Sequence, residues 1–331
     1  MPGACGRQRP ALCVGHVRIA GGTLTASVVT TSNMAKRTSI AQTTADWLLD
    51  ILLRAIITTM MALPYRTRVA VTGQLMQKVI GPVAGYSRRC MQNLAFIYPD
   101  MPMRERRVIC RGALNNAGRT FIENYSTGDL LRRQQDAPLT GDGVAPLYAA
   151  RKKGQAVILV SGHFGNYEAA RAALVGHGFS IGGLYRRAAN RFFNAHYARN
   201  MQAFGGPVFE QGPRGTTGFV RHLKTGGMLV LLFDQHVQEG ETLPFIGQPA
   251  KTAISAAQLA MRYDALLIPF FAVRKSDGLT FDIQLDAPVA VTDPKTMTRA
   301  LNASLEKRIA DHPEQWFWVH RRWKVGRGSV T

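Results

Sequence analysis

The sequence predicts an α/β fold in which helices flank a mainly parallel sheet, preceded by a helical N-terminal region. Three apolar runs suit buried strands: "QAVILVS" (155–161), "MLVLLFDQ" (228–235) and "ALLIPFFAVR" (265–274). Stretches with helical spacing separate these runs, and such alternation is typical of α/β layer folds. With 46% hydrophobic residues in 331, the chain also has ample material for a core.

The N-terminal region begins with an apolar stretch, "WLLDILLRAIITTMMALP" (47–64), which approaches the length of a membrane span. Asp50 and Arg54 interrupt it at an i,i+4 spacing that lets them pair on one helix face. The pattern therefore favours a helix in the membrane interface, or a marginal anchor, over a full span. An ordinary core helix is the alternative.

The remaining elements follow in order. Residues 85–135 are predicted to be helical, with a break at 98–102, and residues 136–154 to be loop-rich because of their Pro and Gly content. Further helices are expected over 166–176, 190–203, 214–227, 252–264 and 294–310, and further strands over 179–185 and 279–289.

Four segments are expected. Residues 1–45 contain no Asp or Glu and are interpreted as a disordered or mis-started extension, with Met34 as the natural start. Residues 46–135 form a helical, membrane-associating region that belongs to one domain with the α/β core over 136–325, and 326–331 form a tail. The four cysteines show neither metal-site nor disulfide-framework spacing.

The charge balance indicates anionic partners. Lys and Arg number 41 against 21 Asp and Glu, which gives a formal net charge of +20. Such a field favours nucleic acid, anionic lipid or an acidic protein, and it does not determine the fold.

The strand-to-helix turn "SGHFGNYE" (161–168) carries the candidate chemistry. His163 lies just past a strand end, where active groups gather in open α/β sheets. Imidazole is the usual general base near neutral pH, and Glu168 is expected to orient it. No nucleophile elbow is present, so the substrate is expected to supply the attacking hydroxyl. A hydrogen-bonded turn histidine is the alternative, and no further metal ligands lie nearby in sequence.

His163 and Glu168 also match the H-x4-D/E motif of glycerolipid acyltransferases. "GHFGNYE", "LYRR" (184–187), "GPRG" (212–215), "FDQ" (233–235), "PFIGQPAKT" (244–252), "ALLIPFFAVR" and "HPEQWFWVHRRWK" (312–324) occur in the order of one family's motifs. Over about residues 45–325, the chain thus resembles the late acyltransferases of lipid A biosynthesis, the lauroyl/myristoyl transferases. Two motifs depart from the family: its Y-R-P is Tyr185-Arg186-Arg187 here, and its F-F-G is Phe245-Ile246-Gly247.

The resemblance implies a glycerolipid acyltransferase-like fold and transfer of a fatty acyl chain from acyl carrier protein to a hydroxyl of a lipid A precursor. It implies His163, Glu168 and Arg186 as catalytic residues, with Arg186 as the oxyanion donor or, alternatively, a ligand of an acceptor phosphate. The residues that it implies for substrate binding are Asn166, Tyr185, Arg214, Asp234, Gln235, Arg321 and Arg322.

No metal or cofactor is expected beyond the acyl donor. The resemblance implies that the enzyme lies on the cytoplasmic face of a bacterial inner membrane, as a peripheral protein or with a single N-terminal anchor. Three alternatives stay open at this point: the same chemistry on a lysophospholipid, ornithine lipid or glycolipid, a basic nucleic-acid-binding protein, and a non-catalytic membrane-surface protein. Against the second, the sequence has no helix-turn-helix, zinc-finger or RNP motif.

Overall fold

The structure is a computed structural model that describes residues 40–185, 187 and 190–324. The chain divides into two units, Met1–Thr43 and Thr44–Thr331, and the elements described here belong to the second, apart from the start of α1. The extension predicted over 1–45 lies outside the described residues except for 40–45, which begin α1 (Ile40–Met61). The tail predicted over 326–331 also lies outside them.

The core is a seven-stranded sheet in the order β1-β9-β8-β2-β5-β3-β4. Only β8 and β9 are antiparallel among neighbouring strands, so the prediction of a mainly parallel α/β sheet is confirmed. The strands are β1 (Leu139–Thr140), β2 (Val157–Ser161), β3 (Ile181–Tyr185), β4 (Val208–Glu210), β5 (Met228–Leu232), β8 (Leu266–Arg274) and β9 (Phe281–Leu285).

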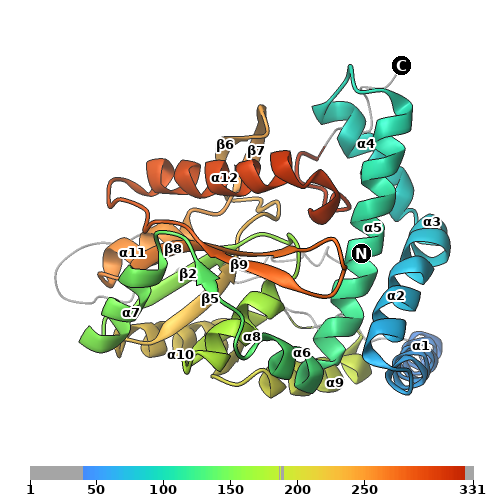
Figure 1. Ribbon diagram of the computed structural model, residues 1–331, viewed down its shortest axis with the longest axis horizontal. Helices are drawn as coiled ribbons and strands as arrows, with labels where there is room; N and C mark the ends of the chain where they lie inside the picture. Colours follow the sequence, from blue (N-terminus) through green and yellow to red (C-terminus); the bar gives the residue numbers. More distant parts are fainter. Residues whose placement is uncertain (1–39, 186, 188–189, 325–331) are drawn as a thin grey trace, which may run out of the picture. The chain divides into compact units, whose positions relative to one another are not determined.

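Both faces of this sheet are covered. In β2, Ile158 and Val160 enter one apolar cluster and Val157 and Leu159 enter another. Successive side chains of a strand point to opposite faces, so a strand buried on both sides must be apolar throughout. That requirement explains the unbroken "VILVS" run. Figure 1 shows α12 (Pro294–Asp311) above the sheet and α8 (Tyr167–Gly176) with α6 (Thr127–Gln134) below it.

The N-terminal helices pack beside the sheet, around the long helix α5 (Met103–Tyr125). They are α2 (Tyr65–Leu75), a π-helical turn η1 (Met76–Ile80), α3 (Gly81–Val83) and α4 (Tyr86–Ile97). Gly118 of α5 permits the close approach of α2, because a Cβ there would lie 2.6 Å from the Thr72 carbonyl oxygen. The helical content and the break near 98–102 are as predicted.

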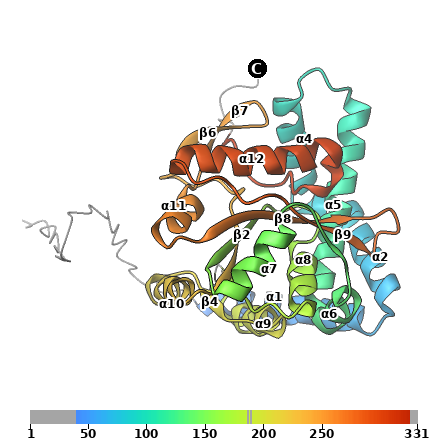
Figure 2. The ribbon, with the colours of Figure 1, turned by 60° about the vertical axis from the view of Figure 1, so that its left-hand side comes forward.

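The remaining helices cover the sheet or connect its strands: α7 (Val144–Lys153), α9 (Arg191–Ala203), α10 (Pro213–Lys224), α11 (Ser255–Arg262) and the single turn η2 (Pro313–Gln315). Figure 2 shows α7 and α8 in front of the sheet, and both helices contribute side chains to the same apolar cluster. The prediction of loop over 136–154 was wrong: α7 occupies its second half, and Gly154 ends that helix in the left-handed conformation.

The hairpin of β6 (Glu241–Phe245) and β7 (Gln248–Thr252) was not predicted. Its alternation is weak because Pro244 and Pro249 sit opposite each other in the pair. A two-stranded ribbon tolerates proline, since every strand in it is an edge.

Helix α1 confirms the predicted ion pair: Arg54 Nε lies 3.0 Å from Asp50 Oδ1. Within the described residues, no helix meets the length and hydropathy that crossing a bilayer requires.

Candidate functional site

The turn that follows β2 is fixed from several sides. Gly165 adopts a φ of +54°, and a Cβ there would lie 1.8 Å from the carbonyl oxygen of Ala272 on β8. Only glycine fits that position. The C-terminal segment lies along the turn, where Phe317 N–H donates to the His163 carbonyl at 2.9 Å and Gly165 N–H to the Gln315 carbonyl at 3.0 Å.

His163 meets Asp234 at this edge of the sheet. β2 and β5 are parallel neighbours, and the two residues each follow the carboxyl end of one of them. His163 Nδ1 lies 2.7 Å from Asp234 Oδ1, and the His163 backbone N–H donates to Asp234 Oδ2 at 2.8 Å. A carboxylate only accepts, so we assign the ring proton to Nδ1.

Asp234 is held as a carboxylate. It is fully buried, and burial by itself would raise its pKa. Charge attraction and hydrogen bonding from His163 outweigh that effect and hold the pKa of Asp234 well below its usual range. Trp316 Nε1–H adds a third hydrogen bond, to Oδ2, at 2.9 Å.

The other ring nitrogen of His163 is left as an acceptor. The Gln235 side-chain amide lies 3.3 Å from Nε2, and both groups reach solvent, with 23% of the His163 side chain exposed. A lone pair on Nε2 therefore faces the exterior of the sheet edge, where a substrate hydroxyl can approach.

A second histidine, His320, stacks edge-on against His163 with ring centroids 4.4 Å apart. Burial, followed by the positive charge that His163 carries when it is protonated, lowers the pKa of His320 to about 3. Its ring is consequently neutral at physiological pH, and its buried Nε2 has no hydrogen-bond partner among the described residues.

In the described part of the chain, one group of three side chains could hold a metal ion: His163, Asp234 and His320, whose ligand atoms lie within 4.8 Å of one another. Both Asp234 oxygens already accept hydrogen bonds from His163 or Trp316. A metal ion bound to both His163 Nδ1 and Asp234 Oδ1 would have to displace the proton that lies between these atoms. The hydrogen bonds are therefore those of a histidine–carboxylate pair.

Glu168 does not orient His163, so the prediction from the H-x4-E spacing was wrong on this contact. The Glu168 carboxylate is buried and faces Arg171, whose Nη1 lies 3.4 Å away. Burial raises the pKa of Glu168, partly opposed by Arg171. The spacing brings Glu168 into the first turn of α8, where its carboxylate pairs with Arg171, and Arg171 in turn donates to the Ile181 carbonyl on β3.

Asn166 starts α8 as its N-cap. Its Oδ1 accepts from the backbone N–H groups of Glu168 and Ala169, and its Nδ2 donates to Glu123 at 2.8 Å. The whole amide is buried and engaged, so the structure gives it a capping role instead of the substrate contact expected of it.

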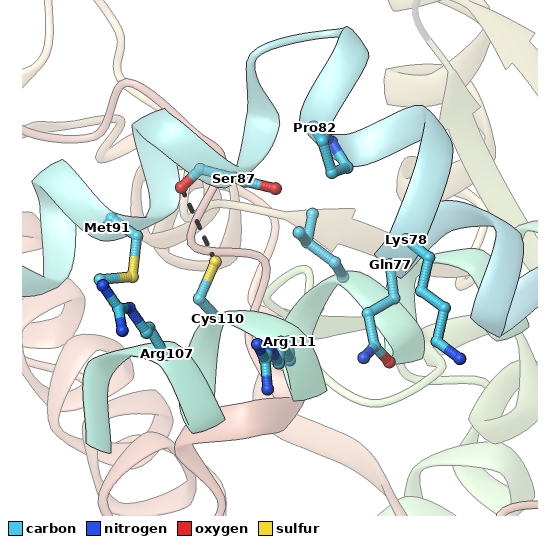
Figure 3. Close-up of a pocket in the computed structure, with 9 residues that line it drawn as sticks. Gln77, Lys78, Pro82, Ser87, Met91, Arg107, Cys110 and Arg111 are labelled. Atoms are coloured by element: carbon cyan, nitrogen blue, oxygen red, sulfur yellow. Dashed lines mark hydrogen bonds between the residues drawn. The ribbon is translucent and has the colours of Figure 1, made fainter. Parts of the chain in front are cut away.

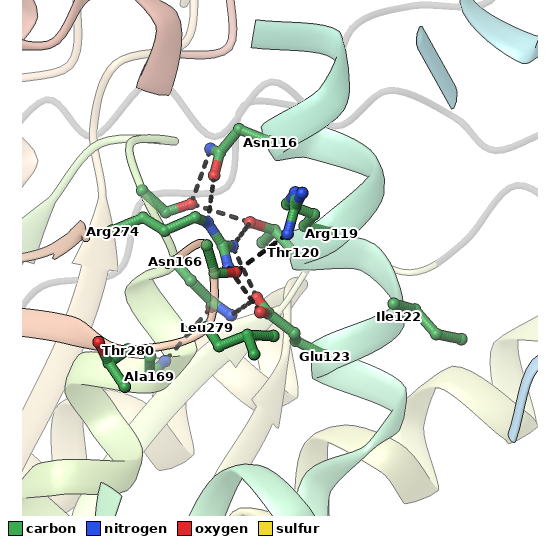
Figure 4. Close-up of polar contacts among 12 residues, drawn as sticks. Asn116, Arg119, Thr120, Ile122, Glu123, Asn166, Ala169, Arg274, Leu279 and Thr280 are labelled. Carbon is green, nitrogen blue, oxygen red and sulfur yellow. Dashed lines mark hydrogen bonds and ion pairs between the residues drawn. The ribbon is translucent and has the colours of Figure 1, made fainter. Parts of the chain in front are cut away.

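Behind this cap lies a buried ion pair that the sequence analysis missed (Figure 4). Arg274 Nη1 and Nη2 lie 2.6 and 2.7 Å from the two oxygens of Glu123. Arg274 Nε also donates to Asn116, and Asn116 Nδ2 donates to the Gly165 carbonyl. The network thereby ties α5 and β8 to the turn that carries His163.

The residues implied around Tyr185 are only partly described. The Tyr185 hydroxyl, at the end of β3, donates to Glu210 at 3.0 Å. Arg186 lies outside the described residues, and Arg214 is exposed on α10. None of the described contacts of Tyr185 or Arg214 reaches His163.

The two C-terminal arginines differ. Arg321 is exposed, whereas Arg322 is fully buried, with Nη1 donating to the Lys251 carbonyl and Nη2 to Thr252 Oγ1, both at 2.6 Å. Burial lowers the pKa of Arg322 to about 10. Arg322 therefore anchors the β6–β7 hairpin, and the substrate contact expected of it is not available in this arrangement.

Of the implied residues, the structure thus brings His163, Asp234 and Gln235 together. Trp316 and His320 complete the group, and sequence reasoning singled out neither. Both stand in "HPEQWFWVHRRWK", so that motif contained the signal, but nothing in a linear pattern shows that it folds against residue 163.

The fold and site are those of an α/β enzyme with a histidine–carboxylate pair at the carboxyl edge of its sheet. Residues 32–325 match the model of the bacterial lipid A biosynthesis acyltransferase family. The chain belongs to that family, as the sequence motifs predicted, and it is an acyltransferase.

Curated relatives agree. A lipid A biosynthesis acyltransferase of Haemophilus influenzae is 26% identical over 250 residues, covering 72% of this chain and 78% of that protein. Lipid A biosynthesis acyltransferase 2 of Shigella flexneri is 23% identical, covering 73% and 79%. Over a shorter stretch of 84 residues, 24% of this chain and 28% of the relative, the lipid A biosynthesis lauroyltransferase of Escherichia coli is 33% identical.

Proposed function

We propose that the protein transfers a fatty acyl chain from acyl carrier protein to a hydroxyl of a lipid A precursor, with His163 as the general base. The His163–Asp234 pair carries this proposal, because it leaves His163 Nε2 as an accessible acceptor and holds the opposite nitrogen on a buried carboxylate. The names of the relatives support the acceptor.

In the proposed step, the acceptor hydroxyl gives its proton to His163 Nε2 while its oxygen attacks the thioester carbonyl carbon. The new C–O bond forms, the C–S bond breaks, and the thiolate of the carrier leaves and takes up the proton. Asp234 stabilises the imidazolium that exists between these two transfers. General-base help of this kind contributes roughly 10²–10⁴-fold in rate.

The developing oxyanion and the acceptor hydroxyl both need partners. The developing oxyanion requires a donor, and Arg186, which lies outside the described residues, remains our proposed donor or phosphate ligand on the basis of its motif. Gln235 Nε2 lies beside His163 Nε2, and we propose that the acceptor hydroxyl takes its place there.

We also propose that α1 lies in the cytoplasmic interface of a bacterial inner membrane. Its outward face exposes Trp47, Leu48, Ile51 and Leu52, each at least 44% accessible. Its charged pair points inward instead, where Arg54 donates to the Phe192 carbonyl at 3.0 Å. A helix that faces water usually turns its charged residues outward and its apolar residues inward. Helix α1 has the opposite arrangement, which suits contact with a membrane surface.

Acyl transfer in detergent tests the reaction. The wild-type protein or His163→Ala is incubated with a tetra-acylated lipid A precursor and a panel of acyl carrier protein thioesters. The masses of the products are then measured by mass spectrometry. We expect one added acyl mass with wild type and a loss of at least about 10² in rate with His163→Ala. Equal rates of acyl transfer by the two proteins would exclude His163 as the general base.

Two further outcomes distinguish between lipid acceptors, and between an acyltransferase and a nucleic-acid-binding protein. If wild type consumes no thioester with the precursor but does so with a total membrane-lipid extract, the acceptor is another lipid. If it never releases carrier thiol and binds nucleic acid in a salt-sensitive way, the acyl-transfer proposal is overturned.

Flotation with vesicles tests the membrane proposal. Leu48→Glu/Leu52→Glu should release the protein from phosphatidylglycerol-containing vesicles, while Thr58→Glu/Thr59→Glu, at two other exposed positions of α1, should release less of it. Equal retention of wild type and the leucine variant would exclude this face as the contact.

A further inference from the structure

A second candidate binding site lies among the N-terminal helices. A pocket of about 540 Å³ opens between η1, α3, α4 and α5, and none of its lining residues contacts His163. Figure 3 shows the walls: Arg107, Cys110 and Arg111 come from α5, Ser87 and Met91 from α4, and Gln77 and Lys78 from η1.

The charge of this pocket has one sign. Lys78, Arg107 and Arg111 line it, and no carboxylate of the described part of the chain does. All three cations are exposed, and none of them forms an ion pair or a side-chain hydrogen bond with another described residue. Three cations that face one hollow repel one another, so an anion between them would lower their electrostatic energy.

The pocket is also apolar. Pro82, Met91 and Leu114 complete its lining, and three exposed valines lie on the same helices: Val79 beside Lys78, Val83 beside Pro82, and Val108 beside Arg107. Val83 is 85% accessible. A cationic hollow in helices that also expose apolar side chains suits an amphiphile whose charged group enters the hollow.

The backbone of the pocket is fixed in an uncommon form. Gln77 and Lys78 belong to the π-helical turn η1, a form found frequently at functional sites. Its neighbour Gly81 packs so closely that a Cβ would lie 2.7 Å from the Met76 carbonyl oxygen and 3.0 Å from Leu114. Across the pocket, Cys110 Sγ donates to the Ser87 carbonyl at 3.7 Å and ties α5 to α4. The helices that carry the three cations are thus tightly packed against one another.

We propose that this pocket binds the phosphate headgroup of an anionic membrane phospholipid, at a site separate from the acyl-transfer site. Guanidinium groups hold phosphate oxygens through paired hydrogen bonds, and Arg107 and Arg111 lie one turn apart on α5 with Lys78 on the opposite wall. The phosphodiester is held by these three side chains, and the acyl chains extend from the pocket onto the exposed apolar surface of these helices.

Native mass spectrometry of the full-length protein in neutral detergent tests the site, with phosphatidylglycerol as the probe and phosphatidylcholine as the zwitterionic comparison. The test variant is Arg107→Gln/Arg111→Gln. The matched control is Arg221→Gln/Arg299→Gln, which removes two exposed helical arginines far from the pocket lining and gives the same net charge. Lys78→Gln probes the opposite wall independently, so that a folding defect in one variant cannot decide the result.

We expect wild type and control to bind phosphatidylglycerol alike, and the test variant and Lys78→Gln to bind it at least about tenfold more weakly. Equal binding by test and control variants would show a general charge effect and overturn the site. Equal affinity for phosphatidylcholine would overturn the anionic headgroup. Binding of inorganic phosphate as tight as that of the lipid would overturn the lipid assignment.

Discussion

Asp234 holds His163 at two separate atoms: its Oδ1 lies 2.7 Å from the ring Nδ1, and its Oδ2 accepts the backbone N–H at 2.8 Å. One carboxylate therefore fixes both the turn and the ring within it. The sequence separation between the two residues is 71, and only the parallel pairing of β2 with β5 brings them together.

Asp234→Asn should lower kcat far more than it changes KM. An asparagine amide can donate to Nδ1 and so favours the tautomer in which Nε2 carries the proton, which removes the base. A fall of up to about 10⁴ in kcat is expected from the same exchange in a histidine–aspartate pair.

Initial rates of acyl transfer at varied acceptor concentration measure this split. Asp282→Asn, which alters an exposed carboxylate on β9, is the control and should stay within about twofold of wild type. Near-wild-type kcat in Asp234→Asn would mean that the carboxylate only supports the turn.

Glu168→Ala should destabilise the fold by about 3–5 kcal/mol, because it leaves the Arg171 guanidinium buried without its carboxylate. Urea unfolding of the two proteins gives the difference. Replacing both residues, as Glu168→Leu/Arg171→Met, should recover part of the loss. If Glu168→Ala is as stable as wild type and yet inactive, Glu168 acts in the chemistry and its contact with Arg171 is incidental.

Gly165→Ala should disrupt the turn, whereas Gly154→Ala should be tolerated. Both glycines have positive φ, which costs an alanine roughly 1–2 kcal/mol. At Gly154 no atom of the described residues lies within 4 Å of the added Cβ, but at Gly165 the Ala272 carbonyl oxygen is 1.8 Å away. We expect Gly165→Ala to lose more than about 3 kcal/mol in urea unfolding and most of its activity. Similar losses at both positions would show that the Ala272 contact does not matter.

His320 should make the fold acid-sensitive. Its pKa is about 3 when folded, and an unfolded histidine has a pKa of about 6.5. Between these values the unfolded state binds more protons, so stability falls as pH falls from 6.5 toward 3, at up to about 1.4 kcal/mol per pH unit.

His163, Asp234, Arg322 and Arg89 face this ring or act on its charge, and all of them are kept in His320→Gln. Urea unfolding of wild type and His320→Gln between pH 7 and pH 4 should therefore show a shallower dependence in the variant. Identical slopes would mean that other groups carry the acid sensitivity.

The pattern of apolar residues in the sequence predicted the strands correctly where that pattern reflects burial. The strands around "VILVS" and "MLVLL" are apolar because both faces of the sheet are covered, and such runs are visible in a linear sequence. The hairpin β6–β7 was missed because its prolines break the alternation, and α7 because Pro146 and two nearby glycines resemble a loop.

The site shows a different limit. His163 and Asp234 each follow a strand, so both could be named from the sequence, but their pairing depends on strand order, which no local pattern encodes. Glu168 was the nearer carboxylate in sequence and was therefore predicted as the partner. Glu123 and Arg274 could not be found at all, since charged residues in a helix and a strand indicate solvent exposure unless their pairing is known.

The segment that follows η2 has a consequence for synthesis of the protein. Trp316, 82 residues beyond Asp234, donates a hydrogen bond to the Asp234 carboxylate, and Phe317 donates one to the His163 carbonyl in the turn. A ribosome delivers residues in order, so a nascent chain already exposes both proposed catalytic side chains while the wall behind them is still missing. The proposed acyl-transfer site can therefore reach the described arrangement only after residues 313–323 have emerged from the ribosome.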